Sequence, residues 1–458
     1  MPAVEGRVGP RYLAIADSLA EDIRSGRLGV GERLPTHRDL ADALGVTVGT
    51  VSRAYREAIE RGLISGEVGR GTYVRGQERT QRSSGLEFRD PQDRSLIDMG
   101  LNFLRVPEHD HRFAETLATL AREPGVASLF DEYKPQQGLR SHREAGVQWV
   151  ARGGLQVTPD RVLVCAGAQH AMTVAVLALS RPGDTILTDE VTYPTMITLA
   201  RVLHRQLRGV AIDGEGMVPE ALDAACRGHH ARMLYVMPTV QNPTARVMSI
   251  ARRERIAEVA ARHRLAILED DIYGFLSAER LPALASFAPE RGYFIAACTK
   301  SVAPGLRVGF LAVPPGEAGR FFEPLWATAV MASPPMAEIA TRWIGDGTAE
   351  LMAESRRLEA LARQRLARSI LGAAEHDGHE AAFHLWLRVP SNSSSASFVA
   401  CAQQRGVAVI PGEAFAVDEL RPPAVRVSLG PPRDHEELAR GLHVLAELLR
   451  GADAPGVV

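Results

Sequence analysis

Apolar residues recur at helical spacing through the first 75 residues of the chain. The segment RYLAIADSLAEDIRSG, residues 11–26, places leucine, alanine and isoleucine three or four positions apart, which predicts an amphipathic helix. LPTHRDLADALG predicts a second, short helix with Thr36 as its N-cap and Gly45 as its terminator. VTVGTVSRAYREAIERG predicts a third, with Thr47 as its N-cap. Two helices joined by a tight glycine-containing turn are typical of a helix-turn-helix.

The stretch GLISGEVGRGTYV follows the third predicted helix. It predicts two short β-strands around GEVGRG, which form a hairpin or wing. We therefore expect a compact winged unit over residues 1–75. Residues 76–95 are polar and lack periodicity, so we expect a flexible linker there.

From about residue 96 the pattern changes to short apolar runs that alternate with helical stretches. The runs RVLVCAG, DTILTDE, ARMLYVMP and LAILEDD are each followed by a polar or glycine-rich turn. This alternation predicts an α/β fold over residues 96–458, with a largely parallel sheet covered by helices. Because ligands collect at the carboxyl ends of strands in such sheets, the residues that end each run are candidates for a site.

Composition narrows the class of protein. With 45% hydrophobic and 24% charged residues, no membrane-spanning apolar run and no signal-peptide core, we expect a cytoplasmic protein without a membrane partner. The four cysteines are scattered, and EHDH at 108–111 lacks further ligands, so we expect no metal. The formal net charge is −2, so nucleic-acid binding requires a local patch. Residues 1–76 carry 11 arginines against 10 acidic residues, which is little positive charge for a DNA-binding unit.

One lysine stands out because the chain almost always uses arginine. Of the 53 lysine and arginine residues, only Lys134 and Lys300 are lysine. Arginine stays protonated, whereas a partly buried lysine amine can lose its proton and attack an aldehyde. We expect this chemistry at Lys300. Lys134 has no obvious chemical demand, and we expect it to be solvated.

Candidate ligand-binding residues stand at or just after the predicted strand ends: Ala168, Gln169, Tyr193, Asn242, Asp270, Tyr273, Thr299, Lys300 and Arg307. Each alone has an ordinary structural explanation, since Asn-Pro is usually a turn and adjacent acids are often solvent-facing. Together they supply a helix N-terminus for a phosphate, a ring to stack, an amide, a carboxylate and an amine. These are the groups that pyridoxal phosphate requires.

The N-terminal stretch, from IRSGRLGVGERLPTHRDLADALGVTVGTVSRAYREAIERGLI to GRGTYV, resembles the GntR class of winged helix-turn-helix domains. The resemblance implies that the second helix, the start of the third and the wing contact DNA through Arg38, Thr47, Thr50, Ser52, Arg53, Gly69 and Arg70. Many relatives carry arginine where this chain has Val48, so a bidentate guanine contact is absent and the operator should differ. A small protein-interaction module is the alternative.

Residues from about 97 to 450 resemble the fold-type I aminotransferases through YKPQQGLRSHREA, AGAQHA, VTYP, PTVQNPTA, LEDDIYGF, TKSVAPGLRVGF and RGVAVIPGEAF…VRVSLG. The resemblance implies a mainly parallel seven-stranded sheet and a small C-terminal α+β subdomain from about residue 330. It also implies that Lys300 forms an internal aldimine with pyridoxal phosphate and that Asp270 pairs with the protonated ring nitrogen. Asn242 and Tyr273 would bond the ring 3′-oxygen, and Tyr193 would stack on the ring.

The same resemblance assigns the remaining contacts. Phosphate would be held by Ala168, Gln169 and Arg307, with Thr299 as a further cofactor contact and Tyr133 reaching across from the partner of a homodimer. Arg426 would clamp the carboxylate of a substrate or effector. Two departures matter: Ala297 replaces a phosphate-binding Ser or Thr, and Thr195 replaces an arginine found in relatives that sense γ-amino acids.

A GntR-type winged helix followed by an aminotransferase-like domain resembles the MocR family of bacterial regulators. The implied function is a pyridoxal-phosphate-dependent transcriptional regulator that binds paired DNA half-sites as a homodimer and senses a small amino compound through an aldimine. One alternative is a working aminotransferase with an appended domain, in which Lys300, Asp270 and Tyr273 are catalytic. A third possibility is a sensor of the cofactor alone.

Overall fold

The computed structural model describes residues 10–24, 27–28, 32–60, 63–67, 71–74, 95–106, 110–372, 374, 376–390, 393–418 and 422–452. The chain divides into two compact units, Met1–Ser84 and Gly85–Val458. Within the described residues no helix is both long enough and apolar enough to cross a membrane.

Within its described residues the N-terminal unit contains three helices and a β-hairpin, as predicted: α1 (Arg11–Arg24), α2 (His37–Leu44), α3 (Val48–Glu60), β1 (Ile64–Glu67) and β2 (Gly71–Val74). Leu19, Leu40 and Tyr55 come from the three helices and share one core. Thr36 caps α2 in a capping box, and Gly45 ends it at φ +62°. The Thr36 N-cap and the Gly45 terminator are therefore confirmed.

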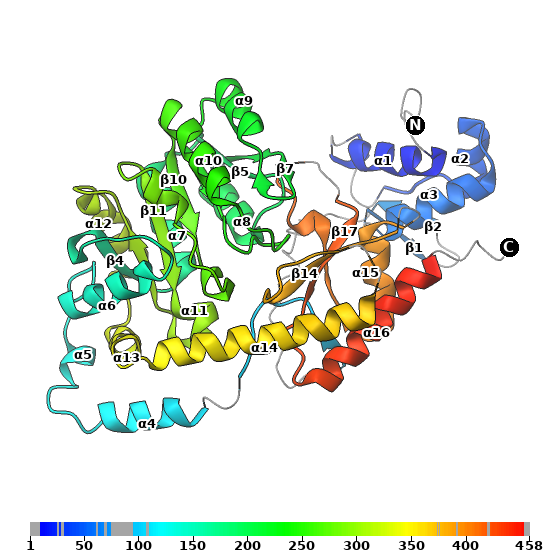
Figure 1. Cartoon of the computed structure of the whole chain (residues 1–458). Helices are drawn as coiled ribbons and strands as arrows, with labels where there is room; N and C mark the ends of the chain where they lie inside the picture. Colours follow the sequence, from blue (N-terminus) through cyan, green and yellow to red (C-terminus); the bar gives the residue numbers. More distant parts are fainter. Residues whose placement is uncertain are drawn as a thin grey trace. The chain divides into compact units, whose positions relative to one another are not determined.

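A seven-stranded sheet forms the centre of the larger unit (Figure 1), in the order β4-β12-β11-β10-β9-β5-β6. Its strands are β4 (Val162–Cys165), β5 (Thr185–Asp189), β6 (Gln206–Val210), β9 (Met233–Val236), β10 (Ala266–Asp270), β11 (Gly292–Ala297) and β12 (Gly309–Ala312). Only β12 is antiparallel to its neighbours, β11 and β4. The mainly parallel sheet is thus confirmed, and its central strands β9 and β11 are buried on both faces, as continuous apolar runs require.

Helices cover both faces of this sheet. Successive residues of β11 show the two faces: Ile295 packs with Met172 of α7, whereas Phe294 packs with Trp149 of α6. The helices of this part are α4 (Asp110–Leu120), α5 (Ser128–Asp131), α6 (Arg140–Ala151), α7 (Ala168–Leu179), α8 (Pro194–Val202), α9 (Pro219–His229), α10 (Ile250–Arg262), α11 (Cys298–Ser301), α12 (Phe322–Ala329) and α13 (Pro334–Gly345).

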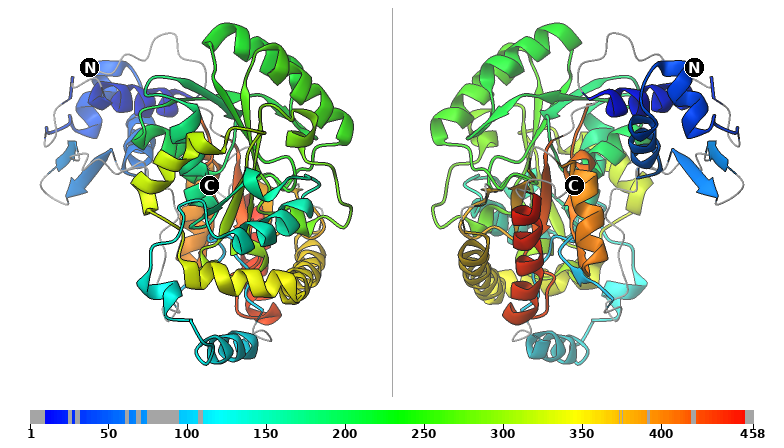
Figure 2. Two further views of the ribbon diagram at one scale, coloured as in Figure 1. Left: turned by 90° about the vertical axis from the view of Figure 1, so that its left-hand side faces the viewer. Right: turned by 90° about the vertical axis from the view of Figure 1, so that its right-hand side faces the viewer.

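A second sheet, in the order β13-β14-β17-β16, is antiparallel throughout. Its strands are β13 (His376–Asp377), β14 (His384–Arg388), β16 (Ile410–Pro411) and β17 (Ala424–Ser428). Helices α15 (Ser395–Gln404) and α16 (His435–Ala452) lie side by side against it (Figure 2). The long helix α14 (Thr348–Leu371) joins the two cores, because Met352 packs near the first sheet and Leu371 near the second.

Two short strand pairs complete the fold. β3 (Ile97–Asp98) runs parallel to β15 (Val407–Ala408), and β7 (Ile212–Asp213) pairs with β8 (Gly216–Met217). The β3–β15 pairing ties the start of the larger unit to its C-terminal part, so that the residues following β3 come to lie beside the ends of the central strands.

Candidate functional site

The predicted cofactor residues gather at the carboxyl ends of β9, β10 and β11. Asp270 is the last residue of β10, Asn242 lies in the turn after β9, and Lys300 lies in α11 directly after β11. Asn242 and Asp270 are almost completely buried. The structure therefore brings together residues that are far apart in sequence, as the parallel sheet predicts.

Asp270 has one satisfied and one free oxygen. Its Oδ2 accepts a hydrogen bond from the Tyr235 hydroxyl at 2.8 Å. Its Oδ1 is buried and has no hydrogen bond of normal geometry within the described residues. Burial raises the pKa of Asp270 to about 6, against the opposing effects of Tyr235, the Ile272 main-chain N–H and the Lys300 charge. A buried acceptor without a donor fits a ligand that brings a protonated nitrogen.

Lys300 loses its proton more readily than an exposed lysine. Its amine donates to the main-chain oxygen of Asn102. Burial, followed by the positive charges of Arg426 and Arg307, lowers the pKa of Lys300 to about 8, while Asp270 acts in the opposite direction. An appreciable fraction of this amine is neutral near pH 7.5, and the neutral form is the nucleophile.

An anion fits the N-terminus of α7, where Ala168 and Gln169 present N–H groups that the helix itself does not use. Gly167, at φ +87°, precedes them, and a Cβ there would lie 3.0 Å from the Arg307 guanidinium. The Arg307 guanidinium donates to the Ala166 carbonyl at 3.3 Å. The hydroxyl of Thr299 is buried and lacks a partner within the described part of the chain.

A second group of contacts surrounds Arg426, which is 1% exposed in β17. Its Nη1 donates to Asn242 Oδ1 at 3.0 Å, and its Nη2 donates to the Gly100 carbonyl. The guanidinium also lies 4.8 Å from the centre of the Phe415 ring. Burial lowers the pKa of Arg426 to about 10, so it remains charged. The residue predicted to clamp a carboxylate therefore makes internal hydrogen bonds in this structure.

The two predicted tyrosines of the site lie near these groups. The Tyr273 hydroxyl oxygen accepts from Asn102 Nδ2 at 2.7 Å. Tyr193 is the N-cap residue of α8, and burial raises its pKa, with smaller effects from the charges of Asp270 and Arg426.

Sequence reasoning missed three residues of this cluster: Asn102, Tyr235 and His384. Tyr235 bonds Asp270, and Asn102 contacts Lys300, Tyr273 and His384. Each is a residue with a polar group inside an apolar run, in MGLNFL, MLYVMP and AAFHLWL. A buried polar group requires a hydrogen-bond partner, so this pattern was the available signal.

The loop after α5 carries two further residues that were named from the sequence, Tyr133 and Lys134. Tyr133 is 83% exposed, so its predicted role across a dimer stays a prediction. Lys134 was predicted to be solvated, and this was wrong. Its side chain is only 15% exposed, and its amine pairs with Glu132 at 2.6 Å, so a neighbouring carboxylate holds its charge instead of bulk solvent.

The predicted DNA-contacting residues lie on the helix-turn-helix. Arg38 in α2, Thr47 before α3 and Arg53 in α3 are exposed. Thr50 and Ser52 are partly exposed; the main-chain N–H of Thr50 donates to Thr47 Oγ1 at 3.2 Å, which confirms the Thr47 cap. Gly69 and Arg70, the two predicted wing residues, lie outside the described residues.

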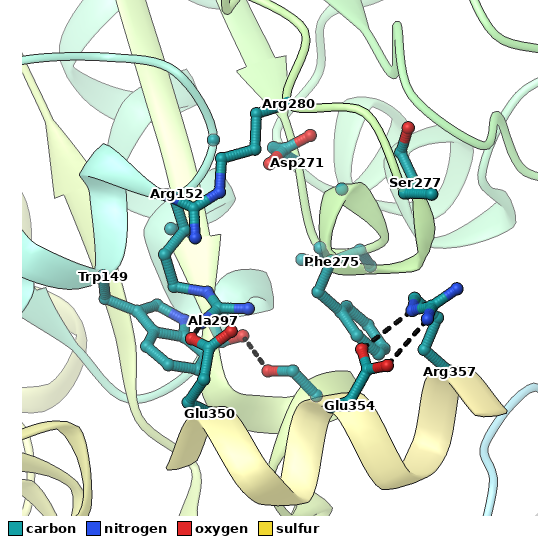
Figure 3. A pocket seen from close by; sticks show the side chains of 16 residues that line it. Trp149, Arg152, Asp271, Phe275, Ser277, Arg280, Ala297, Glu350, Glu354 and Arg357 are labelled. Carbon is teal, nitrogen blue, oxygen red and sulfur yellow. Dashed lines mark hydrogen bonds and ion pairs between the residues drawn. The ribbon is translucent and has the colours of Figure 1, made fainter. Parts of the chain in front are cut away.

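Figure 3 shows a polar cavity of about 230 Å³ that is separate from the residues described above. Its wall includes Arg152, whose guanidinium is 4.8 Å from the Trp149 ring centre, and the Glu354–Arg357 pair of α14. Asp271 also faces it, and burial raises the pKa of that carboxyl. None of the residues predicted to touch the cofactor lines this cavity. Among the described residues no group of three or more His, Cys, Asp or Glu could hold a metal ion.

Comparison with known proteins gives two family matches. The aminotransferase class I and II model matches residues 94–445, and the model for bacterial regulatory proteins of the gntR family matches residues 11–74. The chain is 33% identical to the HTH-type transcriptional regulator YdeF of Bacillus subtilis, across 98% of this chain and 96% of that protein. It is 25% identical to the vitamin B6 salvage pathway transcriptional repressor PtsJ of Salmonella typhimurium, across 94% of this chain and 97% of that protein.

Solved structures share the fold of the larger unit. Kynurenine aminotransferase of Pyrococcus horikoshii superposes with a TM-score of 0.73 at 21% identity, covering 83% of this chain and 99% of that chain. LysN, an α-aminoadipate aminotransferase of Thermus thermophilus, superposes with a TM-score of 0.70 at 22% identity, covering 78% and 93%. The fold-type I aminotransferase architecture is thereby confirmed.

Proposed function

From the premise that the chain belongs to the MocR family of bacterial regulators, in which a GntR-type winged helix precedes an aminotransferase class I and II domain, we propose the following function. The protein is a pyridoxal-phosphate-dependent DNA-binding transcriptional regulator whose larger unit senses the cofactor and a small amino compound. One observation carries the proposal. The same chain holds a capped helix-turn-helix and a partly buried lysine close to an aspartate with a free oxygen.

Pyridoxal phosphate supplies an aldehyde that reacts with amines and a ring that withdraws electrons when its nitrogen is protonated. Lys300 provides the amine, and Asp270 Oδ1 accepts from the ring nitrogen. Asn242 and Tyr273 face the ring oxygen, and Tyr193 stacks on the ring. The free Asp270 oxygen and the depressed pKa of Lys300 support these roles.

The phosphate of the cofactor is held by Ala168, Gln169, Thr299 and Arg307. The unpartnered Thr299 hydroxyl supports this placement and offsets the hydroxyl missing at Ala297. The Cβ space at Gly167 also supports it, because a side chain there would displace the Arg307 guanidinium. A partner subunit contributes Tyr133 to the same phosphate.

The winged helix binds operator DNA through α2, the start of α3 and the wing. The contacting residues are Arg38 in α2, Thr47, Thr50, Ser52 and Arg53 at the start of α3, and Gly69 and Arg70 in the wing. Val48, at the start of α3, is 44% exposed and apolar. An apolar side chain in the major groove contacts a thymine methyl rather than a guanine. A homodimer would read two half-sites in this way.

The chain provides its own control for testing the lysine, because it has only one other. Lys300→Arg keeps the positive charge but stays protonated, so the visible absorbance of lysine-bound pyridoxal phosphate should disappear. Lys134→Arg should leave that absorbance unchanged. A band that survives Lys300→Arg would remove Lys300 from the site.

DNA binding is tested on the same proteins by gel shift with the promoter of the chain's own gene. Binding that responds to pyridoxal phosphate, and further to an amino compound, supports the sensor. A response to the cofactor alone indicates a cofactor-level sensor, in which the Arg426 clamp has no ligand.

A working aminotransferase is the second candidate, favoured by the lysine of depressed pKa beside an acidic residue. Single-turnover absorbance against a panel of amino acids measures conversion of the cofactor to its amine form. Rapid conversion combined with no operator binding would overturn the regulator proposal.

A further inference from the structure

Asn102 lies between three residues of the candidate site. It is 7% exposed and belongs to the segment that follows β3. Its main-chain oxygen accepts from the Lys300 amine. Its side-chain Nδ2 lies 2.7 Å from the Tyr273 hydroxyl and 3.0 Å from His384 Nδ1. None of these contacts was predicted from the sequence.

The direction of each hydrogen bond follows from His384. This side chain is fully buried in β14, and its Nε2 lies 3.2 Å from the Gln241 main-chain oxygen. A carbonyl oxygen only accepts, so Nε2 carries the hydrogen. Burial and the charges of Arg426 and Lys300 lower the pKa of His384 to about 3, so the ring is neutral and Nδ1 is an acceptor.

The acceptor at His384 fixes the Asn102 amide. Nδ2 must be the atom that faces His384, and its two hydrogens serve His384 Nδ1 and the Tyr273 oxygen. The remaining amide atom, Oδ1, is buried and has no partner in the described residues. The Tyr273 oxygen is therefore occupied as an acceptor, and its own hydrogen is left for another group.

We propose that Gln241, His384 and Asn102 form a hydrogen-bond relay, in which Asn102 donates to both His384 and Tyr273, and that this relay makes Tyr273 a donor to the ring oxygen of the bound cofactor. Asn102 and His384 are positioning residues, because they act through Tyr273. This inference rests on the proposed function, in which Tyr273 faces that oxygen. The charged groups around the relay are Lys300, Arg426 and Asp270.

The relay predicts a spectroscopic effect. A donor at the ring oxygen stabilises its negative charge, so the chromophore attached to Lys300 loses its proton at lower pH. Asn102→Asp replaces the donor with an acceptor of the same shape, which draws the Tyr273 hydrogen away. We expect the pH midpoint of the absorbance change to rise by about one unit, as in Tyr273→Phe.

Two substitutions at His384 separate the effect of hydrogen-bond direction from the effect of side-chain packing. His384→Leu removes the acceptor and should also raise the midpoint. His384→Gln retains a donor for Gln241 and an acceptor for Asn102, and should restore the native midpoint. Leu101→Ala, in the same segment, is the matched control and should titrate like the native protein. Native titration in both Asn102→Asp and His384→Leu would overturn the relay.

A measurement without cofactor keeps this test separate from the proposed function. In protein labelled with nitrogen-15 histidine, the His384 signal, identified by its loss in His384→Gln, should show hydrogen on Nε2 and none on Nδ1. Asn102→Asp should protonate Nδ1 as well. Hydrogen on Nδ1 in the native protein would refute the relay, whereas failure of pyridoxal phosphate to bind would refute only the proposed function.

Discussion

At the scale of single residues, the candidate site is defined by acceptors and donors that the protein leaves unused. Tyr235 bonds only one oxygen of Asp270, and Thr299 has a buried hydroxyl without a partner in the described residues. Buried polar groups without partners are rare and costly. Their concentration beside Lys300 is the physical reason to place a ligand there.

The hydrogen bond from Tyr235 offers a test of how the pKa of Asp270 is set. Tyr235→Phe removes a hydrogen bond that lowers the pKa of Asp270, so that pKa should rise and the carboxylate should pair less well with the ring nitrogen. We expect pyridoxal phosphate to bind roughly tenfold more weakly, as loss of about 1.4 kcal/mol implies. Absorbance titration measures this.

Tyr293→Phe is the control for that substitution. Tyr293 lies in β11, two strands away from the β9 strand of Tyr235, and its hydroxyl contacts Glu317 at 3.4 Å. Equal weakening by both substitutions would mean that loss of any buried hydroxyl loosens the sheet, and Tyr235 would have no special role.

The depressed pKa of Lys300 predicts a pH dependence of cofactor attachment. Only the neutral amine attacks, so the second-order rate should rise about tenfold per pH unit below pH 8 and level off above about 8. An exposed lysine would continue to gain rate up to about pH 10. Stopped-flow absorbance across this range distinguishes the two profiles.

The residues that were not predicted from the sequence show which contacts a single sequence does not reveal. Lys300, Asp270 and Asn242 were found because their chemistry is distinctive and the parallel-sheet pattern places strand ends together. Asn102 and His384 were missed because these two hydrogen-bonded residues lie 282 positions apart in the chain. No periodicity encodes such a contact, and only packing of β14 against the central sheet creates it.

At the scale of elements, the helix-turn-helix depends on its caps. Thr36→Ala removes the side chain that accepts from the Asp39 N–H at 3.3 Å and breaks the capping box of α2. We expect the free energy of unfolding of the N-terminal unit to fall by about 1 kcal/mol. Hydrogen exchange in the full chain measures this change. Asp42→Ala, on the exposed surface of the same helix, should cost nothing.

At this scale, the direction of a strand was harder to predict from the sequence than its presence. The apolar run of β12 indicates a buried strand, but alternation of side chains is the same in both directions. The connection from β11, residues 298–308, contains only α11 and a short turn. A parallel crossover needs a longer return path, so the chain reverses and β12 is antiparallel. The length of the connection, and not the apolar pattern, therefore indicates the direction of β12.

At the scale of the whole molecule, the exposed ring of Tyr133 points to assembly. Phe130, in the same region, is 67% exposed, and a pair of exposed aromatics is typical of an interface. A homodimer would bury them and bring Tyr133 to the partner's phosphate site.

Subunit mixing tests this exchange. Tyr133→Phe alone should weaken cofactor binding roughly fivefold, as about 1 kcal/mol for one hydrogen bond implies. A hybrid of a Lys300→Arg chain with a Tyr133→Phe chain has one site with both native residues if Tyr133 acts across the dimer. Pyridoxal phosphate titration of the hybrid should show native affinity at half stoichiometry. Weakened affinity at that site would place Tyr133 in its own subunit.

The internal bonds of Arg426 set the concentration range of the proposed sensor. Its guanidinium already holds Asn242 and Gly100, so an incoming carboxylate must compete with groups that never diffuse away. The effector can bind only while the arginine is free, so its apparent affinity is the intrinsic affinity multiplied by the fraction of time that the arginine is free. Such a receptor has a high threshold: it ignores traces of its effector and responds when that compound becomes abundant.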